Sequence, residues 1–242
     1  MKDFMNVYND SKRASSYAKL KFPGTYHLAF RDLPMIIKEH IIGLEALDFG
    51  CGAGRSTRFI RNLGFQTIGV DISQTMIDEA YKTDPTGHYH LINDGELNGV
   101  SSKRFDLVFS AFTFDNIPGY EKKVILYKEF FRVLKPTGIV INLVSSPELY
   151  VNEWASFSTK DFTTNKTAKC GDKVYTIMND VEDKRPVEDV FWPDDDYKKV
   201  YRLSGFDVAN IYKPLASPDD PYIPVNENHT APWTIYVLNK QN

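Results

Sequence analysis

The chain has 242 residues, of which 42% are hydrophobic and 14% aromatic, and 29 basic and 32 acidic side chains give a formal net charge of −3. This composition supplies the core of one α/β domain over residues 1–242 and excludes a largely disordered chain. There is no basic run to bind a phosphate backbone and no apolar stretch long enough to cross a bilayer, so we expect no nucleic-acid and no membrane partner.

The two cysteines, Cys51 and Cys170, have neither CxxC spacing nor the even framework of a secreted disulfide protein. They indicate a reducing compartment, and we expect a cytoplasmic protein. The sequence does not distinguish a monomer from a homodimer.

The first forty residues precede the regular part of the chain. A helical pattern covers 25–41 and contains Pro34, which should divide it. We therefore expect residues 1–40 to form an N-terminal helical cap.

From residue 44, strand-like and helix-like patterns alternate. Apolar runs typical of buried strands occupy 44–49, 65–72, 88–92, 105–112 and 138–146. Helical periodicity occupies 55–63, 73–82 and 120–134, and a Lys-Pro-Thr-Gly segment ends the last of these. This order predicts βα units in a mostly parallel sheet with helices on both faces.

Beyond residue 146 the alternation stops. We interpret residues 147–193, with a strand-like segment at 173–178, as an insertion that forms a lid over the carboxyl edge of the sheet. A short helix follows Pro193, with Asp194, Asp195 and Asp196 as its cap, and two further strands cover 206–213 and 233–240. A proline-rich loop joins these strands, which predicts an antiparallel edge hairpin in a doubly wound, seven-stranded sheet.

The segment ALDFGCGAGRS at 46–56 carries the strongest functional signal. Its glycines follow the first predicted strand, where open parallel sheets bind their ligands. A dinucleotide-binding turn of a nicotinamide-dependent oxidoreductase would need glycine or alanine at the position of Arg55. Asp48 would repel a phosphate and suits a ligand that carries an ammonium group. A tight turn without any ligand is the structural alternative.

This segment resembles motif I of class I S-adenosylmethionine-dependent methyltransferases. Further segments, IGVDIS, LINDGEL, FDLVFSAF and FRVLKPTG, resemble later motifs of that family in the same order over residues 40–146. The resemblance implies a Rossmann-like methyltransferase fold and S-adenosyl-L-methionine as the cofactor. The aspartates that end three successive strands, Asp48, Asp71 and Asp94, lie 23 residues apart, which favours a shared crevice.

The resemblance also implies which residues bind the cofactor. They are Tyr26, Arg31, Asp48, Gly50, Gly52, Gly54, Asp71, Ile72, Met76, Asp94, Gly95 and Ser110. Structural roles compete at three of them: Asp71 as a helix cap, Met76 as core and Asp94 as a turn residue.

The candidate catalytic residues are Asp115 and Asn116, after the fourth strand, and His229, in the proline-rich loop. Capping of a turn and a solvated loop histidine are their structural alternatives. We expect no metal site, because His88 and His90 have no third ligand nearby. The resulting hypothesis is methyl transfer to an oxygen or nitrogen of a small-molecule acceptor, with a non-catalytic cofactor-binding sensor or scaffold as the alternative of another class.

Overall fold

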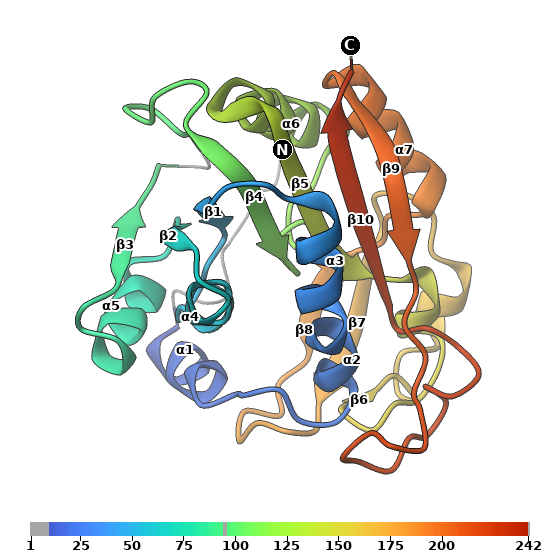
Figure 1. Cartoon of the computed structure of the whole chain (residues 1–242). Helices are drawn as coiled ribbons and strands as arrows, with labels where there is room; N and C mark the ends of the chain where they lie inside the picture. Colours follow the sequence, from blue (N-terminus) through green and yellow to red (C-terminus); the bar gives the residue numbers. More distant parts are fainter. Residues whose placement is uncertain (1–9, 94–95, 242) are drawn as a thin grey trace.

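A computed structural model describes residues 10–93 and 96–241, and its centre is a seven-stranded sheet in the order β3-β2-β1-β4-β5-β10-β9 (Figure 1). The strands are β1 Glu45–Phe49, β2 Gln66–Asp71, β3 His88–Leu91, β4 Phe105–Ala111, β5 Leu134–Ser145, β9 Phe206–Tyr212 and β10 Trp233–Lys240. Neighbouring strands from β3 to β5 are parallel, and β10 is antiparallel to both β5 and β9. The predicted doubly wound sheet with an antiparallel edge hairpin is confirmed.

Helices cover both faces of this sheet. They are α1 Ser11–Ala18, α2 Thr25–Arg31, α3 Leu33–His40, α4 Arg55–Asn62, α5 Gln74–Thr83, α6 Tyr120–Val133 and α7 Asp194–Leu203. Helices α2, α3 and α4 share a core cluster with one face, and α6 and α7 share a second cluster with the other. Burial is nearly continuous along the central strands β1 and β4 and along most of β5, so both faces of the sheet are apolar and each needs its own layer of helices.

The N-terminal helical pattern is divided as Pro34 predicts. Helix α2 ends at Arg31 and α3 begins at Leu33, with Asp32 between them and the proline in the first turn of α3. Proline is tolerated there because the first N–H groups of a helix have no partner inside it. Helix α1, which the periodicity did not indicate, packs against α5.

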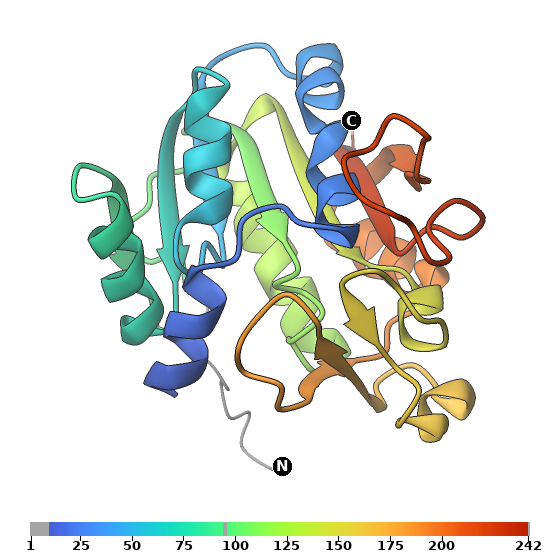
Figure 2. The same cartoon turned by 90° about the horizontal axis from the view of Figure 1, so that it is seen from below.

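Residues 147–190 form elements that belong to no βα unit. Two short 3-10 turns, η2 Pro147–Tyr150 and η3 Thr163–Thr167, accompany β6 Phe157–Ser158, β7 Lys173–Met178 and β8 Val187–Val190. These three strands make a separate antiparallel sheet, which Figure 2 shows beside α1 and below the main sheet. The aspartates of 194–196 lie in the first turn of α7, but Pro193 is the N-cap and no side chain makes a capping hydrogen bond.

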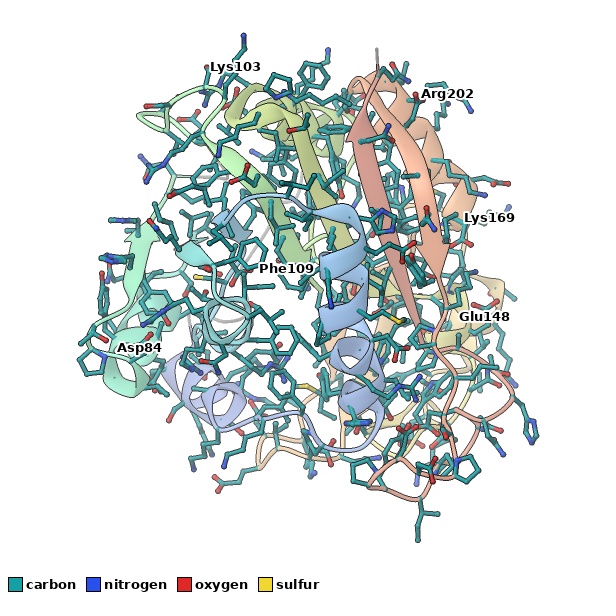
Figure 3. All side chains as sticks on the ribbon, viewed as in Figure 1. Asp84, Lys103, Phe109, Glu148, Lys169 and Arg202 are labelled. Carbon is teal, nitrogen blue, oxygen red and sulfur yellow. The ribbon has the colours of Figure 1, made fainter. Side chains whose placement is uncertain are left out.

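The side chains follow this layering in Figure 3. Phe109 of β4 is fully buried at the centre of the sheet, whereas Lys103, Lys169 and Arg202 are exposed at the periphery. Among the described residues, no helix has the length and apolar character that crossing a membrane requires.

Candidate active site

The glycine turn after β1 has three left-handed positions, Gly50, Gly52 and Gly54, with φ of 72°, 51° and 77°. A Cβ at Gly50 would lie 2.1 Å from Thr113 Oγ1, and one at Gly54 would lie 2.6 Å from the Tyr89 hydroxyl. These two glycines are therefore required by neighbouring protein atoms. At Gly52 a Cβ would lie 3.3 Å from Met76 Cε, and no second atom of the described residues outside the adjoining ones lies within 4 Å. The interpretation that the glycines clear room for a ligand stays a prediction.

Asp71, at the end of β2, fixes the glycine turn. One carboxyl oxygen accepts the Gly52 N–H at 2.8 Å, and the other accepts the Ser73 N–H at 2.8 Å. Ser73 is in turn the N-cap of α5 and accepts the Met76 N–H. Burial raises the pKa of Asp71 although both hydrogen bonds oppose that change.

Asp48 is fully buried beneath the turn. Its Oδ2 accepts hydrogen bonds from Ser56 Oγ at 2.7 Å and Thr57 Oγ1 at 2.6 Å, both in the first turn of α4. Burial raises its pKa to about 6, against the two hydroxyl groups, which lower it. Its Oδ1 is buried without a partner in the described part of the chain. This unsatisfied acceptor fits a ligand that brings a hydrogen-bond donor, such as the ammonium group of S-adenosylmethionine.

The connection after β4 packs directly on the glycine turn. The Thr113 hydroxyl donates to the carbonyls of Phe49 and Gly50, at 3.1 and 3.3 Å. Two residues further on, the Asp115 carboxyl accepts the N–H of Ser145 and, at 2.8 Å, its hydroxyl. The backbone carbonyl of Asp115 accepts the Val190 N–H at 2.7 Å. This connection thus joins the turn, the end of β5 and the end of β8.

A cleft that is open to solvent lies between the main sheet and the small sheet. It is lined by Tyr17, Tyr26, Phe112, Asp115, Asn116, Ser145, Leu149, Phe157, Thr176, Met178, Val187, Asp189 and Trp233. The rings are in mutual contact. The centroid of the Tyr26 ring lies 5.7 Å from that of Trp233, on which it stacks, and the centroid of the Phe112 ring lies 4.8 Å from that of Trp233. This aromatic lining suits a partly flat molecule.

Some of the predicted site residues lie at the cavity or at the glycine turn. Tyr26, Asp115 and Asn116 line the cavity, and Met76, 3% exposed, packs on Ala53 of the glycine turn. Ser110 is buried and its hydroxyl has no partner among the described residues, and Ile72 is exposed.

Arg31 and His229 do not line the cavity. The Arg31 guanidinium pairs with Asp32 and Asp220, and His229 is exposed in a turn of the proline-rich loop. Asp94 and Gly95 lie outside the described residues.

Two charged residues at the site, Arg55 and Asp189, were not among the predicted site residues. The Arg55 guanidinium lies 4.8 Å from the Tyr26 ring and donates to the Tyr17 hydroxyl, so it connects α4 with the N-terminal segment. Asp189 of β8 is 7% exposed and lines the cavity. Strand periodicity places Asp189 on the same face as the buried Val187, and an acid on a buried strand face was the available signal.

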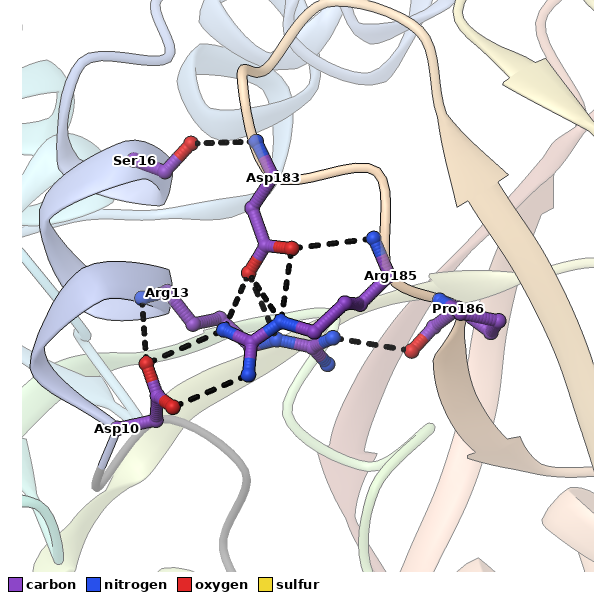
Figure 4. A network of polar contacts seen from close by, with 6 residues as sticks. All are labelled: Asp10, Arg13, Ser16, Asp183, Arg185 and Pro186. Atoms are coloured by element: carbon purple, nitrogen blue, oxygen red, sulfur yellow. Dashed lines mark hydrogen bonds and ion pairs between the residues drawn. The ribbon is translucent and has the colours of Figure 1, made fainter.

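An ionic network holds α1 against the small sheet (Figure 4). Asp183, in the connection between β7 and β8, pairs with Arg13 at 3.3 Å and with Arg185 at 2.7 Å, and Arg185 also pairs with Asp10 at 3.1 Å. The side chains of Arg13 and Asp183 are only 8% and 7% exposed. Since Ala14 of α1 packs on Ala53 and Met76, this network holds α1 over the glycine turn.

Comparison with known proteins agrees with this geometry. Residues 47–142 match the methyltransferase domain family. N-demethylindolmycin N-methyltransferase of Streptomyces griseus is 24% identical over 82% of this chain and 84% of that enzyme. Malonyl-[acyl-carrier protein] O-methyltransferase of Enterobacter lignolyticus is 32% identical, but over only 40% of this chain and 37% of that enzyme. The solved structure of an S-adenosylmethionine-dependent methyltransferase from Clostridium acetobutylicum shares the fold, with a TM-score of 0.62, 16% identity and coverage of 98% and 100%.

The ionic network predicts that Asp183→Asn loosens α1. The substitution leaves the nearly buried Arg13 without its counter-charge, whereas Glu182→Gln removes only the exposed pair between Lys19 and Glu182. We expect hydrogen exchange of the α1 amides to accelerate by about tenfold or more in Asp183→Asn and by less than about twofold in Glu182→Gln. Equal exchange in both variants would mean that apolar packing alone holds α1.

Burial of Asp48 predicts a pH dependence of stability. Its pKa rises from 3.8 to about 6 on folding, so the folded chain keeps a proton that the unfolded chain has lost in this interval. The contribution of Asp48 to the free energy of unfolding therefore falls as the pH rises from about 4 to about 6, by about 3 kcal/mol. Urea unfolding over this range should show a correspondingly smaller fall for Asp48→Asn than for the wild type. Asp78→Asn, on the exposed side of α5, should follow the wild type, and the idea fails if Asp48→Asn does so too.

Proposed function

This chain belongs to the class I S-adenosylmethionine-dependent methyltransferases, and from that membership we propose that it transfers the methyl group to an oxygen or nitrogen of a small molecule by in-line displacement. The observation that carries the proposal is the contact between Thr113 and the glycine turn. This contact joins the glycine turn to the connection after β4, whose Phe112, Asp115 and Asn116 line the cavity, and so supports a donor and an acceptor site next to each other.

On the donor side, we assign the cofactor to the open face of Gly52, with Asp71, Met76 and the unsatisfied oxygen of Asp48 around it. The cofactor supplies a methyl group bound to a sulfonium sulfur. The thioether that this sulfur becomes on transfer is a good leaving group. The protein then has to align the acceptor with that methyl group and exclude water. The packing of Ala14 in α1 on Ala53 and Met76 supports the exclusion of water.

On the acceptor side, we assign Asp115 and Asn116 to the site of transfer, because they line the cavity immediately after β4. Burial raises the pKa of Asp115 to about 6, against its bonds to Ser145. A carboxylate with this pKa is mostly ionised at neutral pH and suits a general base that takes the proton released from the acceptor. The activities of the two relatives support nitrogen and oxygen as alternative acceptor atoms.

Incubation of the purified protein with methyl-labelled S-adenosylmethionine and a small-metabolite mixture tests the activity. We expect labelled products in the small-molecule fraction and their absence without the protein. Cofactor binding without any labelled product would instead favour a sensor.

Gly52→Val tests the cofactor site. Its side chain would enter the open space beside Met76, so we expect S-adenosylhomocysteine to bind more than about tenfold more weakly by calorimetry. Gly64→Val is the matched control, since Gly64 also has a positive φ, 99°, but no atom of residues 10–93 and 96–241 lies within 4 Å of the added Cβ, and it should bind normally. Normal binding by Gly52→Val, or binding of NADH in place of S-adenosylhomocysteine, would contradict the assignment.

A further inference from the structure

The charge of the cavity restricts the acceptor further. Its wall holds two carboxyl groups, Asp115 and Asp189, which are 4% and 7% exposed. None of the described residues that line the cavity is Lys, Arg or His. Two buried carboxyl groups with no cationic side chain among these lining residues disfavour an anionic ligand and favour a cationic one.

The two acids differ in how many hydrogen bonds their carboxyl oxygens accept. Both oxygens of Asp115 accept from Ser145, and the charge of the buried Lys123 lowers its pKa and so stabilises its ionised form. Within the described ranges, Asp189 receives one hydrogen bond, from the Tyr150 hydroxyl to Oδ2 at 3.2 Å. Its Oδ1 has no donor there, although the residue is more than nine-tenths buried and lines the cavity. An acceptor atom in this position is satisfied by a ligand.

The aromatic side of the cavity suits the same ligand. Tyr26, Phe112 and Trp233 present rings to the space that Asp189 borders. An aromatic lining of this kind suits flat apolar groups.

We propose that Asp189 is the specificity-determining residue of this cavity, and that it binds a basic nitrogen, an amine or amidine, carried by an acceptor whose flat apolar part lies against Tyr26, Phe112 and Trp233. This inference rests on the proposed function and names the substrate class of the same site. The nitrogen bound by Asp189 is an anchor, which differs from the atom that receives the methyl group.

Binding of such a cation is linked to a proton. Burial and the charges of Asp115 and Glu188 raise the pKa of Asp189 well above its usual range, and the Tyr150 hydroxyl opposes them. A cationic group beside this carboxyl favours its ionised form and so opposes the upward shift of its pKa.

Three flat probes of nearly equal shape test the proposal: benzamidine, which is cationic, benzamide, which is neutral, and benzoate, which is anionic. Calorimetry is done on the full chain with saturating S-adenosylhomocysteine. We expect benzamidine to bind at least about tenfold more tightly than benzamide, and benzoate to bind more weakly than either. Equal binding of benzamidine and benzamide would overturn the proposal.

Asp189→Asn assigns the effect to the residue. It keeps an acceptor for Tyr150 and removes the charge, so the preference for benzamidine should disappear. Glu188→Gln makes the same change one residue earlier, on the opposite face of β8, and should keep the preference. Retention of the preference in Asp189→Asn contradicts the assignment. Should that variant fail to fold, the comparison of the three probes on the wild type still tests whether the cavity prefers a cation.

The two proposals fail in different ways. If S-adenosylhomocysteine does not bind the wild type, the proposed function fails. If it binds and the wild type does not prefer benzamidine, only the role of Asp189 is lost.

Discussion

The geometry of the site depends on the hydrogen bonds of Asp115. Its carboxyl accepts the N–H and hydroxyl of Ser145 at the end of β5, and its carbonyl accepts the Val190 N–H at the end of β8. Loss of the carboxyl would leave buried donors unsatisfied, at a cost of about 1–3 kcal/mol each. These bonds join the main sheet to the small sheet, and the cavity lies beside them, with Asp115 and Ser145 in its lining.

Burial at this junction also controls the charges around it. Lys123 of α6 is fully buried, with its ammonium donating to the Phe114 carbonyl and lying 4.6 Å from the Trp192 ring. Burial lowers the pKa of Lys123 to about 7 and raises that of Asp115 to about 6, so the pKa of each group lies near neutral pH. The attraction between the two opposes both shifts and keeps the ionised pair accessible.

The sequence predicted those features that depend on neighbours along the chain. The strands follow from runs such as 138–146, the division of the N-terminal helix follows from Pro34, and the turn follows from its glycines. It did not predict contacts between distant segments. Arg31 pairs with Asp220, 189 positions away, and Gly50 is a glycine because of Thr113, neither of which any local pattern encodes. Asp189 was not predicted because β8 has only four residues. Alternation over four residues is too short to distinguish a buried acid in a strand from an acid in a turn.

Tyr26 belongs to both halves of the site. Its ring lies 4.8 Å from the Arg55 guanidinium, at the start of the helix that follows the glycine turn, and it stacks on Trp233 at the cavity wall. Substitution of this tyrosine therefore alters the contact with α4 and the aromatic wall of the cavity together. A side chain at position 26 has to satisfy both surroundings at once.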